Sequence, residues 1–137
     1  MQYIGKIDIE NFSGISDKEI LTDKVILTEK QREHIFQRHQ EVLQKYEKYF
    51  TDIVEKPDYI LKDNSKKNTA LILKTIIEED KSQNIIGRFY LVLRLAVEDD
   101  DINNKNSIIT CFQINEKRMQ SYRKNREIIW QRLDKNE

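Results

Sequence analysis

The sequence has few of the residues that form flexible linkers, disulfides or metal clusters. Its 137 residues include three glycines, one proline and a single cysteine, Cys111. One cysteine cannot form a disulfide within the chain or supply a cysteine-rich zinc site, so a reducing, cytoplasmic setting is expected. The scarcity of glycine and proline, together with the lack of an internal repeat, predicts a single domain spanning residues 1–137.

An excess of one charge and long apolar runs are also missing. Lys+Arg and Asp+Glu each total 24, so the formal net charge is zero. A nucleic acid would therefore have to bind a local basic patch, because counterion release depends on the phosphates that are contacted. No run approaches the length of a membrane span, and the N-terminal residues alternate apolar and polar side chains, unlike a signal peptide. We expect no contact with a membrane.

The first half of the chain predicts two short strands followed by a long helix. The strands are expected at residues 3–9 and Lys24–Leu27. Thr28 begins a capping-box pattern, so a helix is expected at 29–49, and Pro57 ends the helical region. Successive residues at about 100° place one apolar stripe on this helix. The stripe contains Ile35, His39, Val42, Leu43, Tyr46 and Phe50.

The second half predicts an antiparallel meander of three strands and a basic C-terminal helix. The strands are expected at Thr69–Ile77, 88–97 and 107–114. From Glu116 the chain is basic and helical in pattern, with Trp130 expected to dock the helix onto the domain. The predicted fold class is thus α+β, with an N-terminal helix packed on an antiparallel sheet.

Alternation in the middle strand separates a core face from an open face. Phe89, Leu91 and Leu93 mark the core face, which leaves Tyr90 and Arg94 on the open one. A matching register in the two hairpins would bring Lys74 opposite Tyr90 and Thr110 opposite Arg94. These four residues then form a patch that binds RNA or, equally, an exposed sheet face without a ligand.

The two histidines of the chain lie close together on the predicted helix. His34 and His39 are accompanied there by Arg32 and Arg38. Histidine transfers protons near neutral pH and arginine binds phosphate through two parallel hydrogen bonds, which suits RNA cleavage by an adjacent 2′-hydroxyl. The simpler interpretation, favoured by spacing alone, is a core histidine at His39 beside a solvated helix edge.

Other chemistries receive less support from the sequence. The two histidines are five residues apart, unlike the i, i+4 pair of a zinc helix, so no metal site is expected. Cys111 fits a small core residue better than a nucleophile. A glycine-rich phosphate loop and a G-x-S-x-G elbow are missing, which disfavours nucleotide hydrolysis and esterase chemistry.

The sequence resembles the phage-associated branch of the barnase/EndoU/colicin/RelE-like nucleases, whose members place a helix before an antiparallel sheet. The segments that carry the resemblance span most of the chain. They are VILTEKQREHIFQRHQE at 25–41, KPDYIL at 56–61, FYLVLRLAV at 89–97 and SIITCFQI at 107–114.

This resemblance implies metal-independent RNA cleavage with no cofactor. It assigns the H-I-x-x-R-H element, here His34, Ile35, Arg38 and His39, to the active site. It also implies a hydroxyl residue on the last strand, for which Thr110 is the matching position. A catalytic glutamate of the barnase type has no counterpart on these strands, so a barnase mechanism is not expected.

Two functional hypotheses follow. The first is an RNA endonuclease, toxin-like or phage-associated, that acts on tRNA or mRNA, free or on the ribosome, and has an immunity or antitoxin protein as partner. The second is a non-catalytic interaction module that binds protein or nucleic acid through the basic C-terminal helix. A fully buried, hydrogen-bonded His39 would favour the second.

Overall fold

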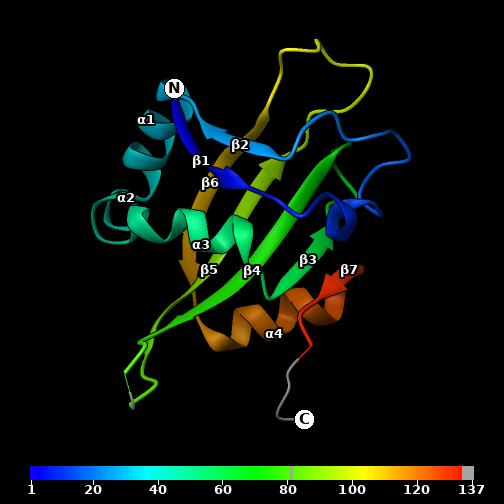
Figure 1. Cartoon of the computed structure of the whole chain (residues 1–137). Helices are drawn as coiled ribbons and strands as arrows, with labels where there is room; N and C mark the ends of the chain where they lie inside the picture. The colour runs from blue at the N-terminus through cyan, green and yellow to red at the C-terminus, as the bar shows by residue number, and fades with distance from the viewer. Residues whose placement is uncertain (81, 134–137) are drawn as a thin grey trace.

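The computed structural model describes residues 1–80 and 82–133, and its strands form one mixed sheet flanked by helices (Figure 1). The strands are β1 (Gln2–Lys6), β2 (Lys24–Leu27), β3 (Tyr59–Lys62), β4 (Thr69–Ile77), β5 (Ile85–Arg94), β6 (Asn106–Ile114) and β7 (Ile128–Gln131). The helices are α1 (Glu29–Arg38), α2 (Gln40–Tyr46), α3 (Phe50–Glu55) and α4 (Glu116–Asn125), with 3₁₀ turns η1 (Ile9–Phe12) and η2 (Glu47–Tyr49). In the described part of the chain, no helix combines the length and apolar character that a membrane crossing requires.

The sheet has the strand order β1-β2-β6-β5-β4-β3-β7. Strands β4, β5 and β6 form the predicted antiparallel meander at its centre. The pairing of β2 with β6 is parallel, whereas β1, β3 and β7 pair with their neighbours in antiparallel fashion. The α+β prediction is therefore confirmed, and the sheet is larger than the sequence indicated.

The predicted cross-strand register is wrong at both hairpins. Lys74 lies opposite Phe89 and not Tyr90, while Thr110 lies opposite Val92 and not Arg94. In the second hairpin a bulge between Val92 and Leu93 shifts the pairing of β6. Such a bulge adds one unpaired residue to a strand and leaves no signature in an apolar sequence.

Both faces of the sheet are buried over much of their area, which explains why the residues of β4 were assigned to the wrong faces. Ala70, Ile72 and Ile76 belong to the larger core with Phe89 and Leu91. Leu71 and Leu73 pack in a smaller cluster on the other face, together with Tyr90, Val92, Ile114 and Met119. A strand buried on both faces reads as a continuous apolar run, so alternation cannot assign its faces.

The helix predicted at 29–49 is interrupted at His39. The predicted cap is present, because Thr28 Oγ1 accepts a hydrogen bond from the Gln31 amide at 3.2 Å. His39 has φ −142° and ψ 54°, which ends α1 and begins α2. Ile35, Val42 and Phe50 are nevertheless buried as the stripe predicts. Apolar periodicity thus continued across a break in the backbone.

Two short strands were not predicted from the sequence. β3 and β7 pair with each other at the end of the sheet, and Trp130 lies in β7 opposite Ile60 instead of on the C-terminal helix. The strand predicted at 88–97 begins earlier, at Ile85, and ends at Arg94. Strands of four residues carry too little pattern for recognition without knowledge of their partners.

The side chain of Asn106 forms hydrogen bonds beside the parallel pairing of β2 with β6. Its side chain is fully buried, and its amide nitrogen donates to the carbonyl oxygens of Thr22 at 2.8 Å and Lys24 at 3.0 Å. Its carbonyl oxygen accepts from the Ala96 amide at 2.8 Å. Because buried polar groups are costly when unpaired, this one side chain fixes three backbone groups from two segments of the chain.

We expect Asn106→Ala to lower the free energy of unfolding by about 1–3 kcal/mol or more, since it leaves buried backbone groups without partners. The matched control is Asn104→Ala, an exposed residue of the same connection, which should change stability by less than about 0.5 kcal/mol. Urea denaturation measures both. Equal losses in the two variants would show that the Asn106 side chain does not hold this junction.

Candidate active site

Helix α1 lies beside the part of β6 that β2 leaves uncovered. Within the described residues, β2 pairs with β6 only through Val25 opposite Asn106 and Ile26 opposite Ser107. Beyond Ser107, the outer edge of β6 is approached by α1 and α2 instead (Figure 1). α1, which carries His34, and the break at His39 are therefore placed along the strand that carries Thr110.

The first histidine lies near the beginning of this stretch of β6. His34 is half-buried and lines a surface hollow together with Ile109 of β6 and with Lys30, Gln31, Glu33 and Gln37 of α1. Ile109 is the residue of β6 that the bulge leaves unpaired, and it is partly buried against the smaller cluster. His34 therefore faces β6 and does not point away into solvent.

The second histidine lies further along the same strand. The imidazole of His39 lies against the ring of Phe112, with centroids 5.1 Å apart and planes inclined by 32°. His39 is half-buried. A core histidine with satisfied hydrogen bonds, the simpler interpretation of the sequence, would be fully buried, so this position does not match it.

Thr110 lies on β6 between the two residues that the histidines approach. Ile109 precedes it, and Phe112 follows two residues later on the same side of the strand. In the described part of the chain, the buried Oγ1 atom of Thr110 has no hydrogen-bond partner. A buried hydroxyl without a partner is uncommon in native proteins.

Aromatic rings link this region to helix α4. Phe112 stacks on Tyr90 of β5 at 4.7 Å, and Tyr90 contacts Tyr122 of α4 at 4.6 Å. The Tyr122 hydroxyl accepts a hydrogen bond from Arg118 at 2.8 Å. We call His39, Phe112, Tyr90 and Tyr122 the ring row. It fixes one side of the His39 imidazole against a continuous apolar support.

The electrostatic environment favours the neutral form of His39. Burial lowers its pKa below the usual 6.5, and the positive charges of Arg38 and His34 lower it further. Burial also raises the pKa of Tyr90 to about 12, with a further contribution from Tyr122. At neutral pH, His39 is therefore a free proton acceptor, and Tyr90 remains an uncharged phenol.

The other predicted substrate-binding residues lie apart from the histidines or from one another. Lys74 is buried and its Nζ lies 3.4 Å from Asp58 Oδ1, on the β3 side of the sheet. Arg94 contacts the Leu95 carbonyl and Asp100 near the far end of β5. Tyr90 is in the ring row with 8% of its surface exposed. The patch of four residues expected from the sequence does not form.

The remaining reactive residues have structural surroundings. Arg32 contacts Glu47 and donates to Gln2 Oε1 at 3.4 Å, so it is held within the fold. Cys111 is fully buried, and burial raises its thiol pKa far above the usual value, which agrees with a core role. Sequence reasoning missed Phe112 and Ile109, although their positions beside Thr110 on one strand were the available signal.

The fold and this site define a small α+β domain in which a helix and the residue that ends it bring two histidines and an arginine to the edge of a mainly antiparallel sheet. The chain belongs to the phage-Barnase-EndoU-ColicinE5/D-RelE like nuclease 2 family, whose model matches residues 4–131. Searches of curated proteins and of solved structures each gave no significant match. The family places the chain among phage-associated nucleases.

We expect the NMR titration of the His39 imidazole to have a midpoint below 6.5. Arg38→Gln should move this midpoint upward, because it removes a positive charge that lowers the pKa, whereas Arg38→Lys should leave it nearly unchanged. Lys45→Gln, an exposed charge change on α2, is the control.

The pKa of His39 is lower in the folded protein than the usual 6.5, which applies to the unfolded chain. Below about pH 6.5 the unfolded chain therefore binds more protons than the folded protein, so folding stability should fall as the pH falls.

A midpoint at or above the ordinary value would contradict this account of His39. Equal upward shifts in Arg38→Gln and Lys45→Gln would show that the effect comes from overall charge and not from the neighbour. The Arg38→Lys variant separates the loss of charge from any rearrangement of the helix.

Proposed function

We propose that the protein is a metal-independent RNA endonuclease that cleaves by attack of the adjacent 2′-hydroxyl. The observation that carries the proposal is the position of Thr110 on β6, between the residues approached by His34 and His39. Family membership supports nuclease activity. The choice of RNA rests on the chemistry of two histidines and an arginine, which need a neighbouring hydroxyl as nucleophile.

Each residue has a definite role in the proposed reaction. His39 accepts the proton of the 2′-hydroxyl, whose oxygen attacks the adjacent phosphorus, and the bond from phosphorus to the 5′-oxygen breaks. His34 donates a proton to that leaving oxygen. A 2′,3′-cyclic phosphate and a 5′-hydroxyl are the products, and the second proton transfer leaves the atoms balanced.

Arg38 and Thr110 stabilise the phosphate in this proposal. Arg38 is exposed next to His39, and its planar guanidinium is suited to two phosphate oxygens. The Thr110 hydroxyl, unpartnered among the described residues, donates to a third oxygen. Charge that develops on the phosphate during the attack is thus met by groups already in place.

Arg94 is proposed to hold a neighbouring part of the RNA strand. It lines a hollow of about 360 Å³ with Lys105 and Ser107, at the end of β6 before Thr110. Tyr90 is assigned a supporting role, because it is stacked between Phe112 and Tyr122. Lys74 is not included, because its ammonium lies beside Asp58 on the β3 side.

Metal independence is proposed because two histidines and an arginine can carry out the proton transfers and the phosphate contacts by themselves. Among residues 1–80 and 82–133, no three His, Cys, Asp or Glu side chains gather closely enough to hold a metal ion. An RNA target such as tRNA or mRNA, a toxin-like role and an immunity protein remain predictions of the sequence. The non-catalytic module has less support, because His39 is half-buried and not fully enclosed.

The experiment is cleavage of mixed cellular RNA and free tRNA by the purified protein in the presence of EDTA. His39→Ala should reduce the rate by roughly two to four orders of magnitude, as the loss of a general base does. Arg38→Lys should reduce the rate while RNA binding persists, since lysine keeps the charge but loses the planar fork. Thr110→Val should be slower than Thr110→Ser, which retains the hydroxyl.

Gln44→Ala, an exposed substitution on α2, should cleave at the wild-type rate and serves as the control. Circular dichroism and thermal melting establish that each variant folds. If folded His39→Ala and Arg38→Lys proteins cleave RNA as fast as the wild type, the proposed site is wrong. Wild-type protein that binds RNA without cleaving it would favour the interaction module.

A further inference from the structure

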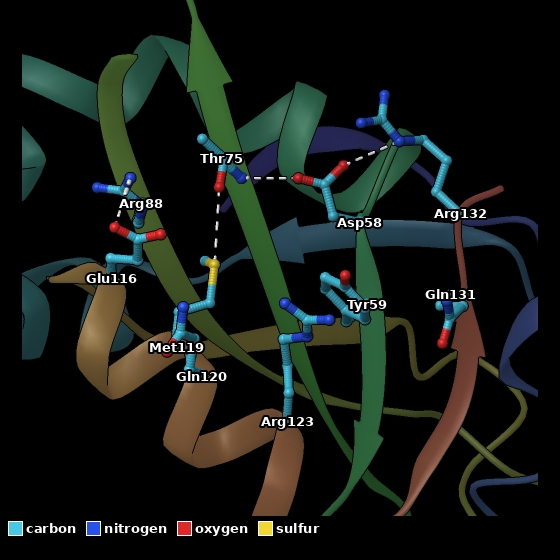
Figure 2. A pocket seen from close by; sticks show the side chains of 10 residues that line it. All are labelled: Asp58, Tyr59, Thr75, Arg88, Glu116, Met119, Gln120, Arg123, Gln131 and Arg132. Carbon is cyan, nitrogen blue, oxygen red and sulfur yellow. Dashed lines mark hydrogen bonds and ion pairs between the residues drawn. The ribbon is translucent and has the colours of Figure 1, made fainter. Parts of the chain in front are cut away.

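Another hollow lies beside α4 (Figure 2). It has a volume of about 310 Å³ and is bounded by α4, the beginning of β3, the end of β4 and β7. Tyr122 of α4 contacts Tyr90 in the ring row, whereas Arg123 of the same helix turns toward Tyr59 of β3. The hollow is therefore separate from the proposed cleavage site.

Three arginines from different elements surround this hollow. Arg123 places its guanidinium over the Tyr59 ring, 4.2 Å from the centroid. Arg88 of β5 lies 3.8 Å from Glu116, and Arg132 contacts Asp58 through Nε at 3.2 Å. The side-on contact of Arg132 engages Nε, which leaves its terminal nitrogens for other acceptors. Gln120 and Gln131 add amide donors to the lining.

The carboxylate at the base of the hollow is already satisfied by the protein. Asp58 Oδ2 accepts from the Thr75 amide at 2.8 Å, and Oδ1 lies near both Lys74 and Arg132. The charged residues that line the hollow are three arginines, Asp58 and Glu116, an excess of one positive charge. This excess stands out in a chain whose formal net charge is zero.

We infer that this hollow binds a phosphate group, as a free phosphate, a mononucleotide or a phosphodiester in an oligonucleotide. Guanidinium groups from three directions and two amides offer many N–H donors. A phosphate group accepts them on its unesterified oxygens, which number four in free phosphate, three in a mononucleotide and two in a phosphodiester. Arg123 is the principal contact, because Arg88 and Arg132 are partly committed to Glu116 and Asp58. The half-buried ring of Tyr59 forms one wall.

The test uses NMR titration of the full-length protein with three probes: inorganic phosphate, uridine monophosphate and a short DNA oligonucleotide. DNA is chosen because it lacks the 2′-hydroxyl, so binding is measured whether or not the protein cleaves RNA. The arginine Nε–H signals of Arg88, Arg123 and Arg132 should shift with saturation. Arg123→Gln and Arg88→Gln should each weaken binding at least tenfold.

The matched control is Lys117→Gln, which removes one positive charge from an exposed position of the same helix, outside the hollow. It should change the affinity less than twofold. Tight binding of the oligonucleotide relative to phosphate would identify a phosphodiester ligand, and the reverse order would identify a small phosphate compound. With the oligonucleotide, Arg123→Gln should also reduce the salt dependence by about 0.7 of a counterion.

Three results would overturn the inference. The arginine signals could fail to shift with any of the probes. Lys117→Gln could weaken binding as much as Arg123→Gln, which would show a diffuse charge effect. An oligoglutamate peptide could bind the hollow more tightly than phosphate, which would identify a carboxylate ligand. Loss of RNA cleavage in His39→Ala tests the proposed cleavage site and does not test phosphate binding in this hollow.

Discussion

The short parallel pairing between β2 and β6 determines where a ligand site can form. Val25 and Ile26 cover only the first two residues of β6, and the Asn106 side chain holds this junction by bonding to three backbone groups. The chain then enters α1 directly through the Thr28 cap. Because β2 ends so early, α1 lies where another strand would otherwise pair, and its side chains reach Ile109 and Phe112.

The break at His39 completes this arrangement. A continuous helix would carry His39 within its apolar stripe, as the periodicity predicted, whereas the non-helical backbone at this residue coincides with an imidazole that lies on Phe112. The ring row extends from that contact through Tyr90 to Tyr122, so α4 packs against the end of the row that is furthest from His39. Partial burial and the neighbouring positive charges then keep the pKa of His39 low.

The sequence predicted the elements with strong local signals and missed those that depend on partners. The Thr28 cap, the three central strands and the α+β class follow from hydrogen-bonding capacity and apolar pattern. The break at His39, the bulge in β6 and the strands β3 and β7 arise from tertiary contacts. The helix element of the candidate site was therefore recognisable, but the pairing of Lys74 with Phe89 was not.

The chemical nature of the cleaved ends tests the central claim most directly, namely that His34, His39 and Thr110 act on a phosphodiester beside a 2′-hydroxyl. A defined RNA oligonucleotide is digested in EDTA and its products are analysed by mass spectrometry. The account predicts 2′,3′-cyclic phosphate and 5′-hydroxyl ends, and no cleavage where the attacking nucleotide is replaced by its 2′-deoxy form. Products with 3′-hydroxyl and 5′-phosphate ends, or cleavage of the 2′-deoxy substrate, would contradict it.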